Sequence, residues 1–211
     1  MKQHTLNMVR FSILLAIEAI FCFTPLGSLP ALGPIVATLA MVPVVLTALL
    51  LGTRAGTAMG AIAGLFSLIV WTFTPPNPLA AFVFTPFYSY GEFQGNFGSL
   101  LICLVPRILT GTVSGGLYRL LSQRPGKDAL HLAISAAVGS LVNTFGVMGG
   151  IWLFFGRAYA SLAGQAMVAI VGLTIVSSGI PEAVLCGIVA PAVCRPVQRI
   201  LSRQQGVAAV K

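Results

Sequence analysis

Long apolar stretches interrupted by very few charged side chains are the feature that most constrains this chain. Only 8% of its residues are charged and 57% are hydrophobic, whereas about one quarter of the residues of a soluble globular protein are charged. One membrane-spanning helix needs roughly 20 apolar residues, so the apolar content predicts five to seven spans. The composition excludes a disordered chain and a fibrous repeat. We therefore expect an all-α integral membrane protein.

The distribution of basic residues favours six spans with an additional short helix before the last one. The expected spans are approximately 9–24, 35–51, 55–73, 97–121, 130–155 and 180–203, in a single transmembrane domain over 1–211. With six spans, ten of the 12 basic residues lie on one side: Lys2, Arg10, Arg54, Arg119, Arg124, Lys127, Arg195, Arg199, Arg203 and Lys211. A seventh span over 158–178 would oppose the positive-inside rule. We expect 158–178 to be a short helix on, or re-entering from, the outer face, with both termini cytoplasmic.

Two segments between the spans contain several prolines. Residues 24–34 carry three prolines and two glycines and predict a loop. Residues 74–96 form the longest expected non-helical segment, in which prolines alternate with aromatic residues. Loops of this length in compact proteins are usually lids or binding loops. We expect the second segment to cover a cavity, with Trp71, Phe84, Tyr88 and Asn96 among the residues that line it.

Small residues recur every three or four positions on three of the expected helices. Gly56, Gly60 and Gly64 lie on one helix and Gly111 and Gly115 on another; such spacing allows helix backbones to approach closely in lipid. Internal packing is the expected role of both glycine rows. Small residues at three further positions form a stripe on the first helix, namely Ser12, Ala16 and Ala19. This stripe either packs internally or docks another membrane subunit, and spacing alone does not decide between the two.

Four polar residues lie where an apolar residue is expected. Glu18, Arg107 and Glu182 are charged residues within or at the start of spans, where a charge is costly and predicts a functional role. Glu182 follows Pro181, and a carboxylate is also favourable at a helix N-terminus. Arg107 either pairs with one of the two glutamates or binds an anionic ligand. Asn143 either bonds a neighbouring helix or contributes to the same site.

Several kinds of chemistry have no matching motif in the sequence. There is no Walker A motif, so the chain has no recognisable ATPase site of its own. The four cysteines form no Cys-x-x-Cys pair, and no metal site, cofactor site or nucleophile–base spacing is apparent. The expected function is a binding site for a small molecule, and no nucleic acid partner is expected. An intramembrane enzyme using Glu18 or Glu182 and a self-sufficient facilitator are the alternatives.

Short motifs spread over nearly the whole chain resemble the substrate-binding S-components of energy-coupling factor (ECF) vitamin transporters. In chain order the motifs are Phe23-Thr24-Pro25-Leu26-Gly27, Leu50-Leu51-Gly52, Val105-Pro106-Arg107-Ile108-Leu109, Gly139-Ser140-Leu141-Val142-Asn143-Thr144 and Gly179-Ile180-Pro181-Glu182-Ala183. Each motif is weak alone, and their order and spacing carry the resemblance. The chain is most similar to the pantothenate-type branch, whose site arginine and asparagine match Arg107 and Asn143.

The resemblance implies a partner set and a function. The partners are a coupling transmembrane subunit and two ATPase subunits, and the ligand is a water-soluble vitamin bound on the outer side of a prokaryotic cell membrane. Pantothenate is the favoured vitamin, with folate, riboflavin or a pyridoxine-type compound as alternatives. The stripe Ser12, Ala16 and Ala19 resembles the family's docking face. Met41 departs from the pattern, because relatives often carry a histidine at this position.

Overall fold

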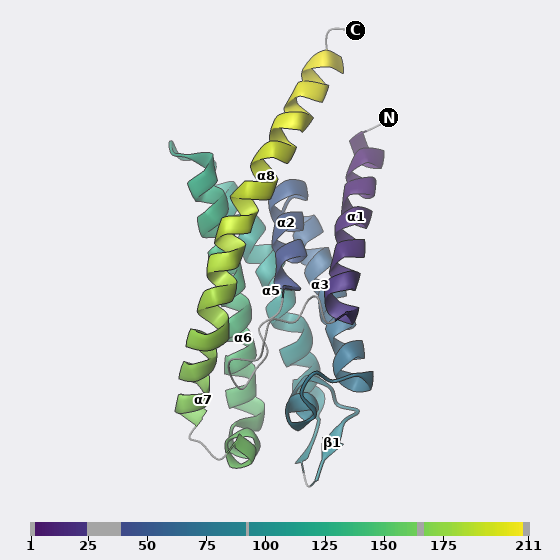
Figure 1. The fold of residues 1–211 in the computed structure, drawn as a ribbon, viewed down its shortest axis with the longest axis vertical. Helices are drawn as coiled ribbons and strands as arrows, with labels where there is room; N and C mark the ends of the chain where they lie inside the picture. Colours follow the sequence, from purple (N-terminus) through teal and green to yellow (C-terminus); the bar gives the residue numbers. More distant parts are fainter. Residues whose placement is uncertain (1–2, 25–38, 92, 164–166, 209–211) are drawn as a thin grey trace.

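The computed structural model describes residues 3–24, 39–91, 93–163 and 167–208, which form a helical bundle (Figure 1). The longer helices are α1 (Gln3–Phe23), α3 (Thr53–Phe73), α5 (Phe97–Leu121), α6 (Asp128–Ala163) and α8 (Ile180–Ala208), and the shorter helix α2 is Met41–Leu51. Within the described residues, five helices are long and apolar enough to cross a membrane, and α2 is a sixth, shorter apolar helix. The expected all-α membrane fold is confirmed.

Helices α2 and α3 are joined by a turn that is shorter than the sequence predicts. Gly52 is the only residue between them, with a φ of 94° that side-chain-bearing residues rarely adopt. Its N–H donates to the carbonyl of Ala48 at 3.1 Å and so satisfies one free carbonyl at the end of α2. The expected loop beyond Thr24 and the first residues of the expected span 35–51 lie outside the described residues.

The glycine rows of α3 and α5 pack against each other, as the sequence predicts. A Cβ atom on Gly56 would come within 3.0 Å of the carbonyl oxygen of Gly111, and a Cβ atom on Gly60 would overlap the carbonyl group of Arg107. The backbones therefore approach as closely as small residues allow, which favours association of helices in lipid. This contact fixes the height of Arg107 relative to α3.

The chain between α6 and α8 differs from the expected separate outer helix. α6 continues to Ala163, and α7 (Met167–Thr174) runs through a π-helical segment, η3 (Ile175–Gly179), directly into α8. Together they give one apolar span over Val168–Ile200. The short helix is thus present before α8, but it is the first part of the last span. The sequence of 158–178 is apolar almost throughout, so hydrophobic periodicity alone does not show where one helix ends and the next begins.

Residues 74–96, expected to be irregular, contain local structure. They form a 3₁₀ turn η2 (Pro78–Ala80), a short helix α4 (Ala81–Phe84) and an antiparallel pair of strands, β1 (Ser89–Tyr90) and β2 (Phe93–Gln94), in which Tyr90 faces Phe93. α4 is tied to α5, because the Ser99 hydroxyl donates to the Phe82 carbonyl at 2.8 Å. The segment is therefore an ordered cap at one end of the bundle.

Two hydrophobic clusters form the core, one toward each end of the helices. The first is built around α2 and includes Val44 and Leu132, and the second includes Phe82 and Ile151. Along α6, Asn143 lies between the residues that belong to the first cluster and those that belong to the second. A layer of polar residues therefore separates the two clusters at the level of Arg107.

The close contact of α3 with α5 leads to a test of packing. Gly60→Ala is expected to lower stability by about 1–3 kcal/mol, because the added methyl group overlaps backbone atoms that cannot move without separating the helices. Thermal unfolding in detergent measures the change. Gly116→Ala on α5 is the matched control, because a Cβ atom there would have nothing within 4 Å. Equal unfolding temperatures of the two variants would contradict the packing role.

Candidate substrate-binding site

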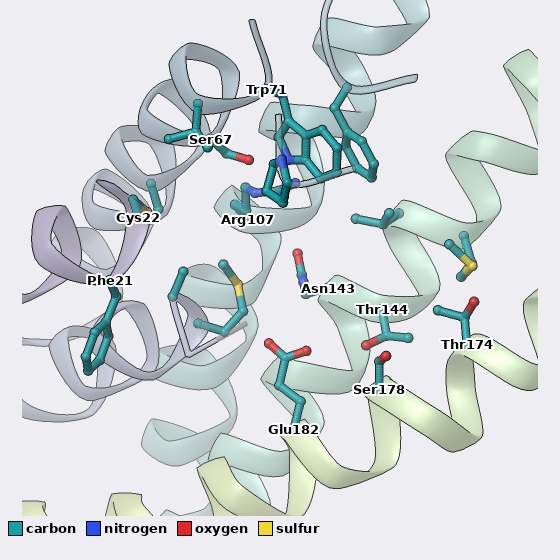
Figure 2. A pocket seen from close by; sticks show the side chains of 18 residues that line it. Phe21, Cys22, Ser67, Trp71, Arg107, Asn143, Thr144, Thr174, Ser178 and Glu182 are labelled. Carbon is teal, nitrogen blue, oxygen red and sulfur yellow. The ribbon is translucent and has the colours of Figure 1, made fainter. Parts of the chain in front are cut away.

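The polar layer between the two hydrophobic clusters encloses a cavity of about 110 Å³ (Figure 2). Its described lining combines apolar walls with a small number of polar groups that converge from α3, α5, α6 and the continuous run of α7, η3 and α8. The polar lining residues are Ser67 from α3, Arg107 from α5, Asn143 and Thr144 from α6, Thr174 from α7, Ser178 from η3 and Glu182 from α8. This combination is the usual form of a small-molecule site.

Arg107 is held in the cavity wall by its own helix. Pro106 has no N–H group, so the carbonyl of Ile102, four residues earlier, has no helical donor. The Nη1 atom of Arg107 donates to this carbonyl at 3.2 Å and to the carbonyl of Cys103 at 2.9 Å. Side chains on a helix point toward its N-terminus, which directs the guanidinium toward Trp71 (Figure 2).

Arg107 has no carboxylate partner among the described residues. Its side chain is only 9% exposed, and its two hydrogen bonds, both from Nη1, go to backbone carbonyls. A guanidinium is always charged and has five N–H donors. Arg107 therefore forms no direct ion pair with Glu18 or Glu182, although its charge interacts with both carboxylates at longer range. The guanidinium remains directed at the cavity.

Three oxygen atoms of the lining have no hydrogen-bond partner among the described residues, and one of them is the Oγ1 atom of Thr174. The Oδ1 atom of Asn143 and the Oε1 atom of Glu182 are buried without a partner in the described part of the chain. Buried polar atoms normally have a partner, and one without is a candidate for ligand binding. Glu18 lies outside the lining. Its Oε1 atom accepts a bond from the Cys22 thiol at 3.2 Å, and its Oε2 atom is likewise buried without a partner in the described part of the chain.

Stacked aromatic rings form one apolar wall of the cavity. Trp71 of α3 and Phe84 of α4 stack with their ring centroids 4.4 Å apart and their planes at 22°. Both side chains are buried and both line the cavity. The position of Phe84 depends on α4, which the bond from Ser99 ties to α5. The ordered segment 74–96 thus contributes to the site through its buried residues.

Five of the seven predicted substrate-binding residues line the cavity: Arg107, Asn143, Trp71, Phe84 and Glu182. The other two lie elsewhere. Tyr88 packs on the hydrophobic cluster around Phe82. Asn96 caps α5, where its side chain accepts a bond from the N–H of Gly98 at 2.7 Å.

Sequence reasoning missed several lining residues. Thr174 and Ser178 precede Glu182 at intervals of four residues, and that spacing was the available signal. The only indication of Thr144 in the sequence was its position next to Asn143. Met41 also lines the cavity, so the departure from the family's histidine pattern falls within the site.

The stripe on α1 lies on the outer surface of the bundle. Ser12 and Ala16 are exposed and Ala19 is partly exposed, while Glu18 on another face of the same helix is buried. The exposed neighbours of the stripe include Ile13 and Ile20. Internal packing, one of the two roles that the spacing allowed, therefore does not describe Ser12 and Ala16.

These features define the class of protein. A multi-pass helical bundle with an internal cavity that contains a buried cation and unpartnered acceptors is a membrane protein that binds a small polar molecule.

The comparisons identify the family within this class. The model of the substrate-specific component of ECF transporters matches residues 6–194. The chain is 30% identical, over 164 residues, to the pantothenic acid transporter PanT of Lactococcus lactis subsp. cremoris (strain MG1363), and the match covers 77% of this chain and 80% of that protein. This chain belongs to the substrate-specific components of ECF transporters and is a non-enzymatic transport subunit.

Proposed function

We propose that this protein binds pantothenate and delivers it to an ATPase-driven coupling module. The observation that carries the proposal is the buried charge of Arg107, which is directed into the cavity and has no carboxylate partner among the described residues. Pantothenate has a carboxylate at one end, and an arginine–carboxylate pair in a dry site is a strong charge-assisted interaction. The similarity to the Lactococcus lactis pantothenic acid transporter supports the same ligand.

Other parts of the cavity suit the rest of this vitamin. The unpartnered Oδ1 atom of Asn143 is an acceptor for the central amide N–H of pantothenate. The stacked rings of Trp71 and Phe84 offer apolar surface to its two methyl groups. Met41 is apolar where relatives often have histidine, and a different lining residue can change which vitamin is bound. Binding measurements on the purified protein should therefore also include folate, riboflavin and pyridoxine-type compounds.

The energy for uptake comes from partner subunits. The sequence has no Walker A motif, and family membership implies an ECF module as partner. The module would consist of a coupling transmembrane subunit and two ATPase subunits. The exposed stripe of Ser12, Ala16 and Ala19 on α1 is the proposed docking surface for the transmembrane subunit, since small residues allow close approach of a second helix.

The orientation in a prokaryotic plasma membrane follows from the charges. α1 begins and α8 ends at the same end of the bundle (Figure 1). The segment 122–127 that links α5 to α6 lies at that end as well, and it carries Arg124 and Lys127. The positive-inside rule assigns this end to the cytoplasm. The end that bears α4, toward which the cavity lies, then faces the outside.

Removal of the Arg107 charge should abolish tight pantothenate binding. Arg107→Ala is expected to weaken binding at least about 100-fold, because the loss of a charge-assisted pair costs about 3 kcal/mol. Titration calorimetry on the purified protein measures the affinity. Arg124→Ala, at an exposed arginine, is the control and should bind normally. Unchanged affinity of Arg107→Ala would exclude the proposed role.

Pantothenate should change the fluorescence of Trp71 and not that of Trp152. The chain has 2 tryptophans; Trp71 lines the cavity, whereas Trp152 is 55% exposed on α6. Titration of Trp152→Phe, in which Trp71 is the remaining tryptophan, should give a saturable change. Trp71→Phe should give none. A signal from Trp152 alone would place the ligand outside this cavity.

A bulky residue in the stripe should uncouple transport from binding. Ala16→Trp is expected to block uptake by cells that also produce the coupling module, because the indole prevents close helix contact, while pantothenate binding to the purified variant stays normal. Leu153→Trp is the control, because Leu153 is exposed on α6, away from the stripe. Equal uptake by the two variants would argue against docking at this stripe.

A further inference from the structure

A row of buried residues at strict four-residue intervals runs along α7, η3 and α8. The row is Ile170, Thr174, Ser178, Glu182, Cys186, Ala190 and Cys194, and none of these residues is more than 6% exposed. In an α-helix of 3.6 residues per turn, residues four apart are offset by roughly 40°. A row of this length would therefore wind away from the bundle interior if the helix were regular and straight.

The π-helical segment η3 counteracts this drift beside the cavity. The N–H of Ile180 donates to the carbonyl of Ile175, five residues earlier, so the turn contains one extra residue. Pro181 supplies the physical cause, because it has no N–H and its ring would clash with the carbonyl of Ser177 in a regular helix. The wider turn keeps the residues on both sides of it aligned.

The alignment turns three polar members of the row toward the cavity. Thr174, Ser178 and Glu182 all line it and face Asn143 and Thr144 of α6 (Figure 2). Of these, the Oγ1 atom of Thr174 and the Oε1 atom of Glu182 are buried without a hydrogen-bond partner in the described part of the chain.

Close packing holds this row against α6. A Cβ atom on Gly179 would lie 2.7 Å from the Cγ2 atom of Thr144, so the glycine allows η3 to approach α6 at the level of the site. In Figure 2, Arg107 and Trp71 lie at one end of the cavity and Ser178 and Glu182 at the other. The cavity therefore has a cationic end and an end rich in hydroxyl and carboxylate oxygens.

We propose that Thr174, Ser178 and Glu182 form a subsite for the hydroxyl-bearing end of the ligand, and that the π segment aligns them for this task. The subsite rests on the proposed function, in which Arg107 binds the carboxylate at the other end of pantothenate. The two hydroxyl groups of pantothenate are donors that can satisfy the oxygens of Thr174 and Glu182. The subsite therefore determines selectivity for a hydroxylated anion over a purely apolar one.

The test compares two ligands on variants that remove one hydroxyl each. The ligands are pantothenate and N-(3,3-dimethylbutanoyl)-β-alanine, which keeps the carboxylate, the amide and the branched carbon chain but lacks both hydroxyl groups. Thr174→Val and Ser178→Ala should each weaken pantothenate binding by about tenfold, as expected for one lost hydrogen bond in a buried site, and leave the affinity for the second ligand unchanged. Ser177→Ala is the matched control, because Ser177 lies in η3 but outside the described lining.

A loss that is selective for pantothenate in at least one of the two variants, and absent in Ser177→Ala, supports the subsite. Equal losses for both ligands, no loss in either variant, or the same loss in the control would overturn it. Normal affinity for the second ligand also demonstrates that a variant is folded. If the unsubstituted protein binds neither ligand, the proposed function itself fails, which is a different result from failure of the subsite alone.

Discussion

The burial of one permanent positive charge within an apolar bundle is the constraint on which the rest of the structure depends. A guanidinium cannot lose its proton, so Arg107 needs acceptors at a depth where water is scarce. Its own helix supplies them, because Pro106 leaves the carbonyl of Ile102 without a helical donor. The contact of Gly60 with the Arg107 backbone then fixes where this charge lies relative to α3.

The polar layer around Arg107 explains how the protein can be both stable and able to bind. Two hydrophobic clusters lie on either side of the layer and supply most of the apolar packing. The layer itself contains acceptors without a protein partner, such as Asn143 Oδ1 and Glu182 Oε1. A ligand that satisfies these atoms gains the energy of bonds that the folded protein alone leaves unmade.

Two prolines lie beside the charged residues that α5 and α8 contribute to the site. Pro106 in α5 frees a carbonyl that holds Arg107, and Pro181 follows the π turn that aligns the polar row of α7, η3 and α8. In both places the missing N–H removes a regular helical bond within one turn of a cavity residue, and beside Pro181 the helix contains a π turn. Irregular helix geometry is tolerated at membrane depth where it borders a cavity.

Strong local signals were sufficient for much of the fold and part of the site. Arg107, Asn143 and Glu182 are conspicuous in apolar segments, and all three line the cavity. The position of Asn96 in the sequence was ambiguous, because an asparagine before a helix can bind a ligand or cap that helix. Here it caps α5. The prediction of a separate outer helix over 158–178 was wrong, because a continuous apolar run does not mark where helices begin and end. Thr174 and Ser178 were missed because single hydroxyl residues are common in membrane helices.

The sequence by itself determined that this chain spans a membrane, which faces of α3 and α5 pack closely, and which charge needs a function. These properties depend on composition and on spacing within one helix. Only the tertiary structure decided that the guanidinium of Arg107 bonds its own backbone, that the stripe on α1 faces outward, and that residues distant in the sequence share one cavity. The reason is physical: such relations depend on the rotation and height of helices relative to one another, and a one-residue change in helical register at η3 alters both.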